Sequence, residues 1–346
     1  MTLASRYLAT KLDIPCLDSV FLSQCMLDVH DCFNKKAFPN ELHVPAGFNN
    51  MCTLVYSSFK QEAPALIDVS LGDKRIIKPP RSKDVLLGFS AGLDSVYQAI
   101  LLKELGYCVH LFFAKNINTY ENGQAWKYAE QIASKLGLEL MAMTVKKDMR
   151  KGKNANDFRQ SWPENPIKNQ LILSVMVDIC IERGWHFISL GDDFDLAISK
   201  SVPGVNTTDA KEVTCAFLDG LKEYVDGIDF LKIPAGHDKS IRLQKMIDYS
   251  LQDLYYSCVQ AGRLNKYMRK LTQDKYGVKL FGNNCGKCRK CCMHNLILHY
   301  SGKIMFPSKF IDDCWKKMYT TGCKADYEFF KPELPLEVRI ANLFSY

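Results

Sequence analysis

From residue 84 onward, short apolar runs alternate with longer stretches in which apolar residues recur every three or four positions. The short runs are typical of buried strands, and the longer stretches are typical of amphipathic helices. Strands are predicted at 84–89, 108–114, 138–145 and 186–190, with helices between them at 94–105, 121–136 and 167–183. This alternation predicts an α/β fold, a doubly wound, Rossmann-like parallel sheet with helices on both faces.

The regions on either side of the alternation have different patterns. Residues 1–80 carry turn formers and end at a Pro-Pro pair, so we expect an N-terminal α+β extension there. β-like runs are predicted in it at 51–58 and 65–70, and helices are predicted near the other end of the chain at 240–258 and 263–274. The expected parts are therefore the extension 1–80, a sheet domain 81–235 and a helical C-terminal region 236–346.

Composition limits the class of protein. The 346 residues are 47% hydrophobic, which is enough for a sizeable core, and no apolar stretch approaches the roughly 20 residues of a membrane span. Charged residues interrupt the first 17 positions, so a secretory signal is not expected and a cytoplasmic location follows by default. Most of the 14 cysteines are scattered among apolar positions, such as Cys52, Cys108, Cys180 and Cys215, where buried thiols are expected.

The net charge of +7 suits polyanionic ligands such as ATP as readily as nucleic acid. The densest basic run, 146–153, lies in a polar, Pro-containing segment that extends to Pro166, and it predicts a loop. Two interpretations of this run stay open. It is either a solvated basic loop or a contact for phosphate or nucleic acid.

The most informative stretch joins the predicted strand 84–89 to the helix that follows it. Ser90 and Ser95 offer hydroxyl groups, Gly92 lets the backbone approach an anion closely, and the helix directs its N-terminal amides at the same place. Asp94 fits such an anion cradle in two ways. It either caps the helix or holds Mg²⁺ that in turn holds phosphates.

The segment Ser90-Ala91-Gly92-Leu93-Asp94-Ser95 resembles the Ser-Gly-Gly-x-Asp-Ser loop of the ATP pyrophosphatases, the PP-loop family. The resemblance implies that ATP is cleaved between its α and β phosphates and that AMP activates a carboxylate or carbonyl oxygen. All six residues would then bind the nucleotide. Ala91 stands where the family has Gly and tolerates positive φ poorly, so we expect the turn to be kept with altered geometry. The alternative is an ordinary strand-to-helix turn.

A second signal is the cysteine-rich string that begins at Cys285. Overlapping Cys-x-x-Cys units place Cys285, Cys288 and Cys291 close enough to bind one soft ion, and Cys258 supplies a fourth thiolate. We assign these four to a structural Zn²⁺ site and keep Cys292 as a substitute ligand. An iron-sulfur cluster, a redox pair and His294 as a ligand are the competing interpretations.

The two motifs together resemble the 7-cyano-7-deazaguanine synthases, a branch of the PP-loop family, over roughly residues 84–300. Matching pieces are Tyr256-Ser257-Cys258 before the cysteine string, Pro166 to Asn169, Leu190-Gly191 and Pro234 to Lys239. By this resemblance Ser90, Gly92, Asp94 and Ser95 would hold the ATP phosphates and Mg²⁺. Lys239 would neutralise charge on the departing pyrophosphate, Asn169 would line the nucleotide or base pocket, and Gly191 would be a further cofactor-binding position.

Departures from that branch bear on the substrate. Its Gly-Tyr-Pro-Asp-Cys-Arg stretch has no clear counterpart near Asp192, Asp193 and Asp195, whose carboxylates would bind Mg²⁺ or a base edge, or simply face solvent. The spacer between Cys258 and Cys285 is long, and residues 1–80 are extra. Relatives with N-terminal extensions occur in bacterial anti-phage gene clusters, where the resemblance implies transfer of a deazaguanine carboxylate to a protein amine.

The sequence therefore predicts an ATP-dependent, AMP-forming ligase that activates a carboxylate, expected to be that of a 7-deazaguanine, and passes it to a nitrogen nucleophile. The acceptor would be ammonia or a protein amine, nucleic acid is not the favoured partner, and a homodimer follows from family likeness only. A tRNA-thiolating PP-loop enzyme is the second hypothesis, and it requires a redox-competent cysteine pair near the nucleotide. A non-catalytic nucleotide-binding scaffold is the third.

Overall fold

The computed structural model describes residues 41–45, 47–58, 65–69, 74–78, 82–115, 123–144, 168–193, 210–234, 237–258, 262–320 and 330–345. Several predicted features lie outside these residues. They are the basic loop 146–153, Pro166, Asp195 and most of the N-terminal extension. None of the described helices is long and apolar enough to cross a membrane.

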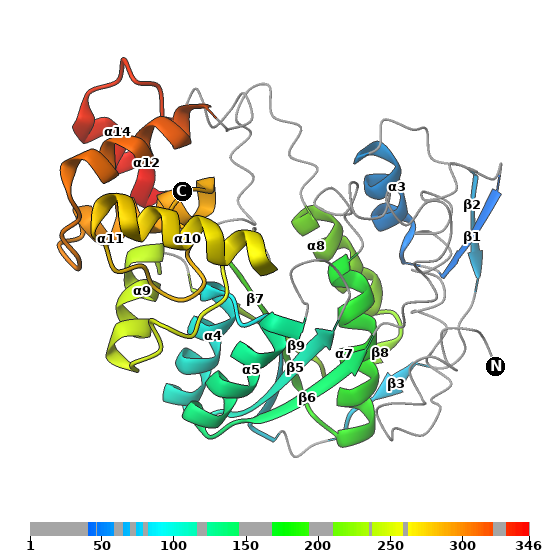
Figure 1. Ribbon diagram of the computed structural model, residues 1–346. Coiled ribbons are helices and arrows are strands. Elements are labelled where there is room, and N and C mark those ends of the chain that lie inside the picture. Colours follow the sequence, from blue (N-terminus) through cyan, green and yellow to red (C-terminus); the bar gives the residue numbers. More distant parts are fainter. Residues whose placement is uncertain are drawn as a thin grey trace.

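A five-stranded sheet forms the centre of the molecule (Figure 1). Its strands are β4 (Asp84–Gly88), β5 (Cys108–Lys115), β6 (Glu139–Thr144), β7 (Phe187–Asp193) and β9 (Asp229–Ile233). They lie in the order β6-β5-β4-β7-β9, and every neighbouring pair is parallel. The predicted doubly wound parallel sheet is confirmed. Strand β9 has no counterpart among the predicted elements.

Helices cover both faces of this sheet. They are α4 (Leu93–Glu104), α5 (Gly123–Leu136), α7 (Lys168–Arg183) and α8 (Ala210–Leu221). Alternate residues of each strand point to opposite faces, so Val85 and Leu87 join the core beneath α4 and α5, whereas Leu86 joins the core beneath α7 and α8. Boundaries predicted for the first three helices agree with the structure within about two residues.

The described part of the N-terminal extension packs on the α8 side. It contains β1 (Glu41–Pro45), α3 (Asn49–Ser58), β2 (Ala65–Val69) and β3 (Arg75–Ile76), and β3 pairs with β8 (Val225–Asp226). The β-like run predicted at 51–58 is wrong, because this segment is helix α3. Phe48, the residue before α3, packs against Phe217 of α8 with ring centroids 5.4 Å apart and the rings tilted by 52°, and tertiary packing of this kind overrides the local β-like pattern.

In the described residues after 233, all elements are helices. They are α9 (Lys239–Asp248), α10 (Gly262–Tyr276), α11 (Arg289–Tyr300), α12 (Ser308–Thr320) and α14 (Leu336–Ser345). The helix predicted at 240–258 ends ten residues early, at Asp248. Ser250 has a positive φ of 53°, which ends helical geometry, and the chain then runs irregularly through residues 251–258. That path carries the chain from α9 to the cysteine cluster.

Candidate functional site

The loop Ser90–Ser95 lies where the winding of the sheet changes direction. Strand β4 has β5 on one side and β7 on the other, and the chain leaves β4 toward β5 before it returns to form β7. Connections that diverge in this way open a crevice at the carboxyl ends of the two strands, where doubly wound proteins bind their ligands. The position of the loop in the fold and its residue composition therefore both make this crevice the candidate ligand site.

Hydrogen bonds inside the loop hold its shape. The hydroxyl groups of Ser90 and Ser95 lie 3.3 Å apart, the Gly92 amide donates to the Ser90 hydroxyl, and the Ser95 hydroxyl donates to the Gly92 carbonyl. Gly92, not Asp94, is the N-cap residue of α4, and it has no side chain with which to cap the helix. The dipole of the helix N-terminus favours an anion at this end of α4.

Ala91 keeps the turn at a conformational cost. Its φ is +59°, in the left-handed region, and its side chain is fully buried. The carbonyl oxygen of Ala91 accepts a hydrogen bond of 2.6 Å from the Tyr256 amide, which fixes this conformation. An L-residue in this region costs about 1–2 kcal/mol relative to the right-handed region, so the loop carries stored strain that a glycine would lack.

Three basic side chains converge on Asp94. The Arg242 guanidinium donates to the Asp94 carboxylate over 2.8 Å, with Arg242 3% and Asp94 37% exposed. Burial opposes ionisation of Asp94, but the charges of Lys239, Arg242 and Lys290 outweigh it and lower the pKa of the carboxyl below its ordinary value. The loop thus combines a helix N-terminus with a concentration of positive charge that exceeds the one negative charge of Asp94.

Helix α9 brings Lys239 and Arg242 to the loop. The Asp238 side chain caps this helix by accepting from the amides of Ser240 and Ile241. Lys239 and Arg242 are three positions apart and therefore lie on the same side of the helix. Arg242 also donates to the carbonyl of His237, whose ring lies 2.6 Å from the Tyr97 hydroxyl of α4. These contacts join α9 to α4 beside the loop.

Position 191 must be glycine because its backbone packs closely against the same loop. It has φ +69°, and a Cβ atom placed there would lie 2.8 Å from the Cα of Ser95 and 3.0 Å from its amide nitrogen. Backbone at that distance cannot move aside without displacing the first turn of α4. The structure therefore places Gly191 beside the loop Ser90–Ser95, and this close packing explains why the residue is glycine.

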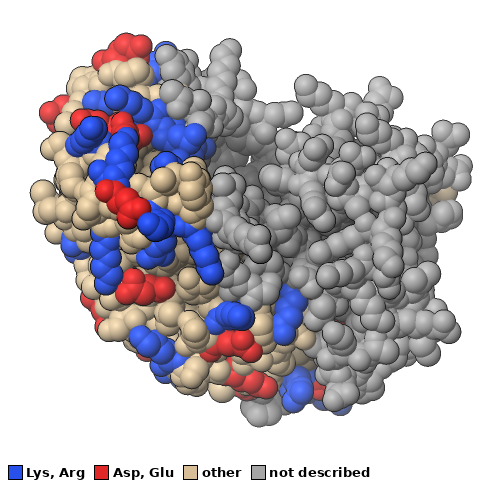
Figure 2. Space-filling view, in the orientation of Figure 1, with Lys and Arg blue, Asp and Glu red and all other residues tan. Residues whose placement is uncertain are grey.

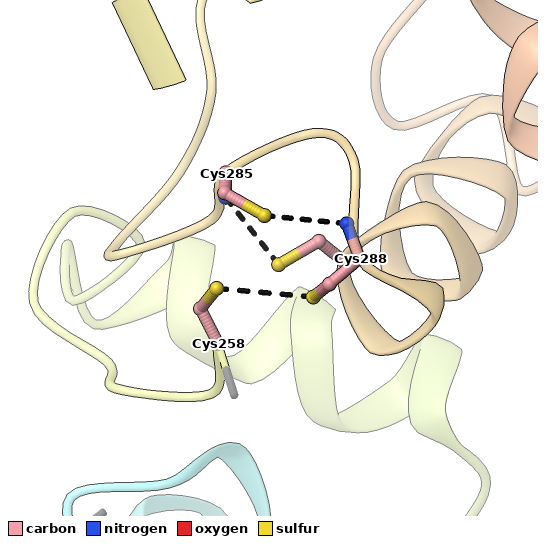
Figure 3. A group of neighbouring side chains, drawn as sticks. Cys258, Cys285 and Cys288 are labelled. Carbon is pink, nitrogen blue, oxygen red and sulfur yellow. Dashed lines mark hydrogen bonds between the residues drawn. The ribbon is translucent and has the colours of Figure 1, made fainter. Parts of the chain in front are cut away.

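The predicted thiolate cluster is assembled in the structure. The sulfur atoms of Cys258, Cys285, Cys288 and Cys291 all lie within 4.8 Å of one another, and all four side chains are buried. Figure 3 shows the sulfurs of Cys258, Cys285 and Cys288 pointing toward a shared centre. Hydrogen bonds among the thiols lower the pKa of Cys285 and Cys288 and raise the pKa of Cys258 and Cys291. Four buried thiols around one point fit a tetrahedral Zn²⁺ ion.

The two substitute ligands are not part of this group. The Cys292 thiol donates to the Gly286 carbonyl instead, and its neighbour Cys314 raises its pKa. His294 is fully buried in α11, and its Nε2 atom has no hydrogen-bond partner in the described part of the chain. Burial, followed by the charges of Lys290 and Lys239, lowers the pKa of His294 to about 3, so this imidazole is neutral.

The cysteine cluster and the loop Ser90–Ser95 are connected by one short segment. The Leu93 amide of the loop donates to the Ser257 hydroxyl over 3.3 Å, next to Cys258. On the other side of this segment, the amides of Ser257 and Cys258 both donate to the Asn283 side-chain oxygen. A short segment between loop and cysteines thus contacts both, and an ion held by the thiolates would fix the position of the loop.

The structure brings together most of the predicted site residues and adds others. Ser90 to Ser95, Gly191 and Lys239 gather at the carboxyl end of β4, and the four cysteines form one group beside them. Asn169 lies in the first turn of α7 and Asp192 and Asp193 end β7, but their side chains are outside the described structure. Sequence reasoning missed Arg242 and Lys290. The three-residue spacing from Lys239 was the available signal for Arg242.

The scattered cysteines are not all buried as predicted. Cys52 and Cys180 are buried, as predicted, and burial raises the pKa of Cys52 to about 12. Cys215 is partly exposed, and Cys108 is exposed at the start of β5. The prediction of a buried thiol is therefore wrong for Cys108, because the first residue of a strand lies at the rim of the sheet rather than within it.

Comparison with known proteins gives limited support for the family. No protein-family model matches the chain. The tRNA-specific 2-thiouridylase MnmA of Protochlamydia amoebophila is 28% identical to it over 121 residues, which are 32% of each protein. The chain therefore matches about a third of the length of this curated relative. The similarity supports the PP-loop family and does not single out the 7-cyano-7-deazaguanine synthases.

Among solved structures, a predicted subunit of a tRNA methyltransferase from Methanocaldococcus jannaschii is similar to 56% of this chain, which corresponds to 87% of that protein. The identity is 18% and the TM-score is 0.33. A likeness at this level carries no argument about function.

Proposed function

We propose that the protein is an ATP-dependent, AMP-forming enzyme of the PP-loop type. The observation that carries the proposal is the convergence of Lys239, Arg242 and Lys290 on a strand-to-helix loop at the N-terminus of α4. Such an arrangement suits a polyphosphate, because amides and cations act on the same anion. Similarity to a 2-thiouridylase over a third of the chain agrees with this class.

The groups around the loop suit cleavage between the α and β phosphates. Pyrophosphate leaves with several negative charges, and fixed positive charge at that point is typically worth a few kcal/mol in the transition state. Lys239 stands at the first position of α9, where its flexible ammonium group reaches toward the loop. Arg242 is buried and already paired with Asp94, so it orients that carboxylate.

Two metal ions belong to the proposal. The Asp94 carboxylate is ionised and 37% exposed, and since Arg242 occupies one of its oxygens, the other would bind Mg²⁺ together with the phosphates. The four buried thiolates would hold Zn²⁺ with no coordination position left for water. That ion would have a structural role, because a closed four-thiolate site offers no place for substrate.

The proposed substrate is a carboxylate, that of a 7-deazaguanine in the leading version, and the acceptor is a nitrogen nucleophile. AMP provides the leaving group, so no side-chain nucleophile is needed. The described cysteines agree with this choice over sulfur transfer. The described cysteines near the loop Ser90–Ser95 are buried in the four-cysteine group or beside it. The exposed Cys108 lies at the opposite edge of the sheet.

The test is product analysis with zinc-loaded protein, Mg²⁺, ATP and a panel of carboxylates that includes 7-carboxy-7-deazaguanine. We expect pyrophosphate to be released as the right carboxylate becomes an acyl-adenylate, and AMP to be released in equal amount once an acceptor amine takes the acyl group. Release of ADP and phosphate, or failure to bind ATP with zinc intact, would contradict the proposal. Ammonia and candidate protein amines, added separately, then identify the acceptor.

tRNA thiolation is the second candidate, and the similarity to the 2-thiouridylase favours it. Figure 2 shows Lys and Arg side chains on the C-terminal helices, with Asp and Glu among them, and these cations would meet a phosphate backbone. This candidate predicts ATP-dependent incorporation of sulfur into tRNA when a persulfide donor and a thiol reductant are supplied together. Adenylation of tRNA instead of a small carboxylate would establish it over the leading proposal.

A further inference from the structure

A second group of metal-ligating side chains lies at the amino ends of the strands, at the opposite edge of the sheet from the nucleotide loop. It consists of Asp84 on β4, Cys108 and His110 on β5, and Glu139 on β6. Neither the proposed nucleotide site nor the cysteine cluster uses any of these four residues. We propose that Asp84, Cys108 and His110 form a site for one divalent transition-metal ion, with Zn²⁺ as the reference occupant.

Strand register assembles the group. Asp84 is the direct partner of Cys108 in the β4–β5 pair, and His110 is the direct partner of Glu139 in the β5–β6 pair. Cys108 and His110 are two residues apart on one strand, so all four side chains are on the same face of the sheet. No loop rearrangement is needed to bring the ligands together.

The key contact is the Nε2 atom of His110. It lies 2.8 Å from the Asp84 carboxylate and 3.6 Å from the Cys108 sulfur, and the ligand atoms of all three residues are within 4.8 Å of one another. A single proton on Nε2 makes one good hydrogen bond, whereas an ion at the centre of the group binds nitrogen, oxygen and sulfur together. This donor set suits Zn²⁺ and its first-row neighbours.

The spacing is close to what a tetrahedral ion requires. Zinc bond lengths of about 2.0 Å to nitrogen and oxygen and about 2.3 Å to sulfur place ligand atoms about 3.3–3.6 Å apart. The nitrogen-to-sulfur distance of 3.6 Å already agrees with this range. The nitrogen-to-oxygen distance of 2.8 Å must lengthen by about half an ångström, which rotation of the partly exposed Asp84 side chain can supply.

The surroundings of His110 are those of a metal-binding histidine. Its second nitrogen, Nδ1, lies 2.6 Å from the Glu139 carboxylate, and this carboxylate–histidine arrangement fixes the ring so that the other nitrogen faces the ion. Trp185 stacks on the imidazole with ring centroids 4.0 Å apart and covers one face of it. Glu139 is thus a positioning residue, and three protein ligands leave a fourth coordination position for water.

The test uses the full-length chain with the four-cysteine site already loaded with one Zn²⁺, as verified by elemental analysis. Titration with Co²⁺ alone should add one further ion per chain, with a sulfur-to-cobalt charge-transfer band from the single Cys108 thiolate. Cys108→Ser should abolish that band, and Cys215→Ser, which removes a partly exposed thiol elsewhere, should leave it unchanged.

Glu139→Gln supplies a variant that should fold normally, because the Glu139 side chain is 57% exposed. Loss of this outer carboxylate should weaken Co²⁺ binding by about 10- to 100-fold while zinc content at the four-cysteine site stays constant. Absence of a second bound ion in the wild type would overturn the proposal. Equal Co²⁺ binding by wild type, Cys108→Ser and Glu139→Gln would also overturn it. The outcome is independent of ATP chemistry at the other edge.

Discussion

The two edges of the central sheet are built in different ways. At the carboxyl edge, the bond from Arg242 to Asp94 spans 148 residues of sequence, and the bond from Leu93 to Ser257 spans 164. At the amino edge, His110 reaches Asp84 and Glu139 across 26 and 29 residues, through adjacent strands alone. The carboxyl edge therefore depends on the C-terminal helices, whereas the amino edge depends only on strand register.

This difference predicts that damage to the cysteine cluster spreads to the loop Ser90–Ser95 and leaves the amino edge unaffected. The segment 255–258 contacts both the cluster and the loop, and no such segment connects the described residues of the cluster to His110. Substitutions that separate the two edges test the comparison.

Cys258→Ser should have the largest effect. Structural zinc sites contribute on the order of 10 kcal/mol to folding, so loss of one thiolate should release zinc, unfold the C-terminal region and abolish ATP binding. Elemental analysis, thermal unfolding and ATP titration provide the measurements. Cys292→Ser is the matched control, because this thiol binds the Gly286 carbonyl and should leave zinc content unchanged. Full zinc occupancy in Cys258→Ser would refute the ligand assignment.

Gly191→Ala should reduce the free energy of unfolding by about 2–4 kcal/mol, since it adds a backbone clash with Ser95 to the strain of a positive φ. Gly184→Ala separates the two causes. Gly184 has a similar φ of +67° with nothing within 4 Å of the added atom, so only the strain of about 1 kcal/mol should remain. Chemical denaturation measures both values, and equal losses would show that Gly191 does not press on the loop.

Arg242→Met should lower the free energy of unfolding by about 1–3 kcal/mol at pH 7, because it breaks a largely buried ion pair whose acidic partner is partly solvated. The pKa of Asp94 is depressed in the folded protein, so its contribution is present above the ordinary aspartate range near pH 4 and is lost as the pH falls through the folded value. The gap between wild type and variant should therefore close in acid. A gap independent of pH would assign the loss to packing alone.

Ala91→Gly should have the smallest effect and the opposite sign. Glycine removes the left-handed strain at φ +59° but adds backbone entropy to the unfolded chain, so a net gain of about 0.5–1 kcal/mol is expected. Thermal unfolding measures the gain, and the hydrogen bond from Tyr256 to the Ala91 carbonyl should persist. A loss of stability would show that the buried methyl group contributes more through packing than its strain costs.

The parts of the molecule that the sequence predicted are those governed by local periodicity. The strands and helices from residue 84 to 190, and the spacing of Cys285, Cys288 and Cys291, depend on neighbouring residues. The contacts of Arg242 with Asp94 and of Ser257 with Leu93, and the pairing of β3 with β8, depend on packing between distant segments, which local periodicity does not reveal. The helical character of 49–58 was missed for the same reason.

Titration of ATP into the zinc-loaded protein tests the central claim most directly, that the carboxyl edge binds the polyphosphate through charges from α9. Wild type is compared with Lys239→Ala and with the control Lys222→Ala. Lys222 follows α8, is exposed and pairs with Asp219. We predict about tenfold weaker ATP binding for Lys239→Ala, corresponding to about 1.4 kcal/mol, and no change for Lys222→Ala. Equal affinities for all three proteins would contradict this account of the site.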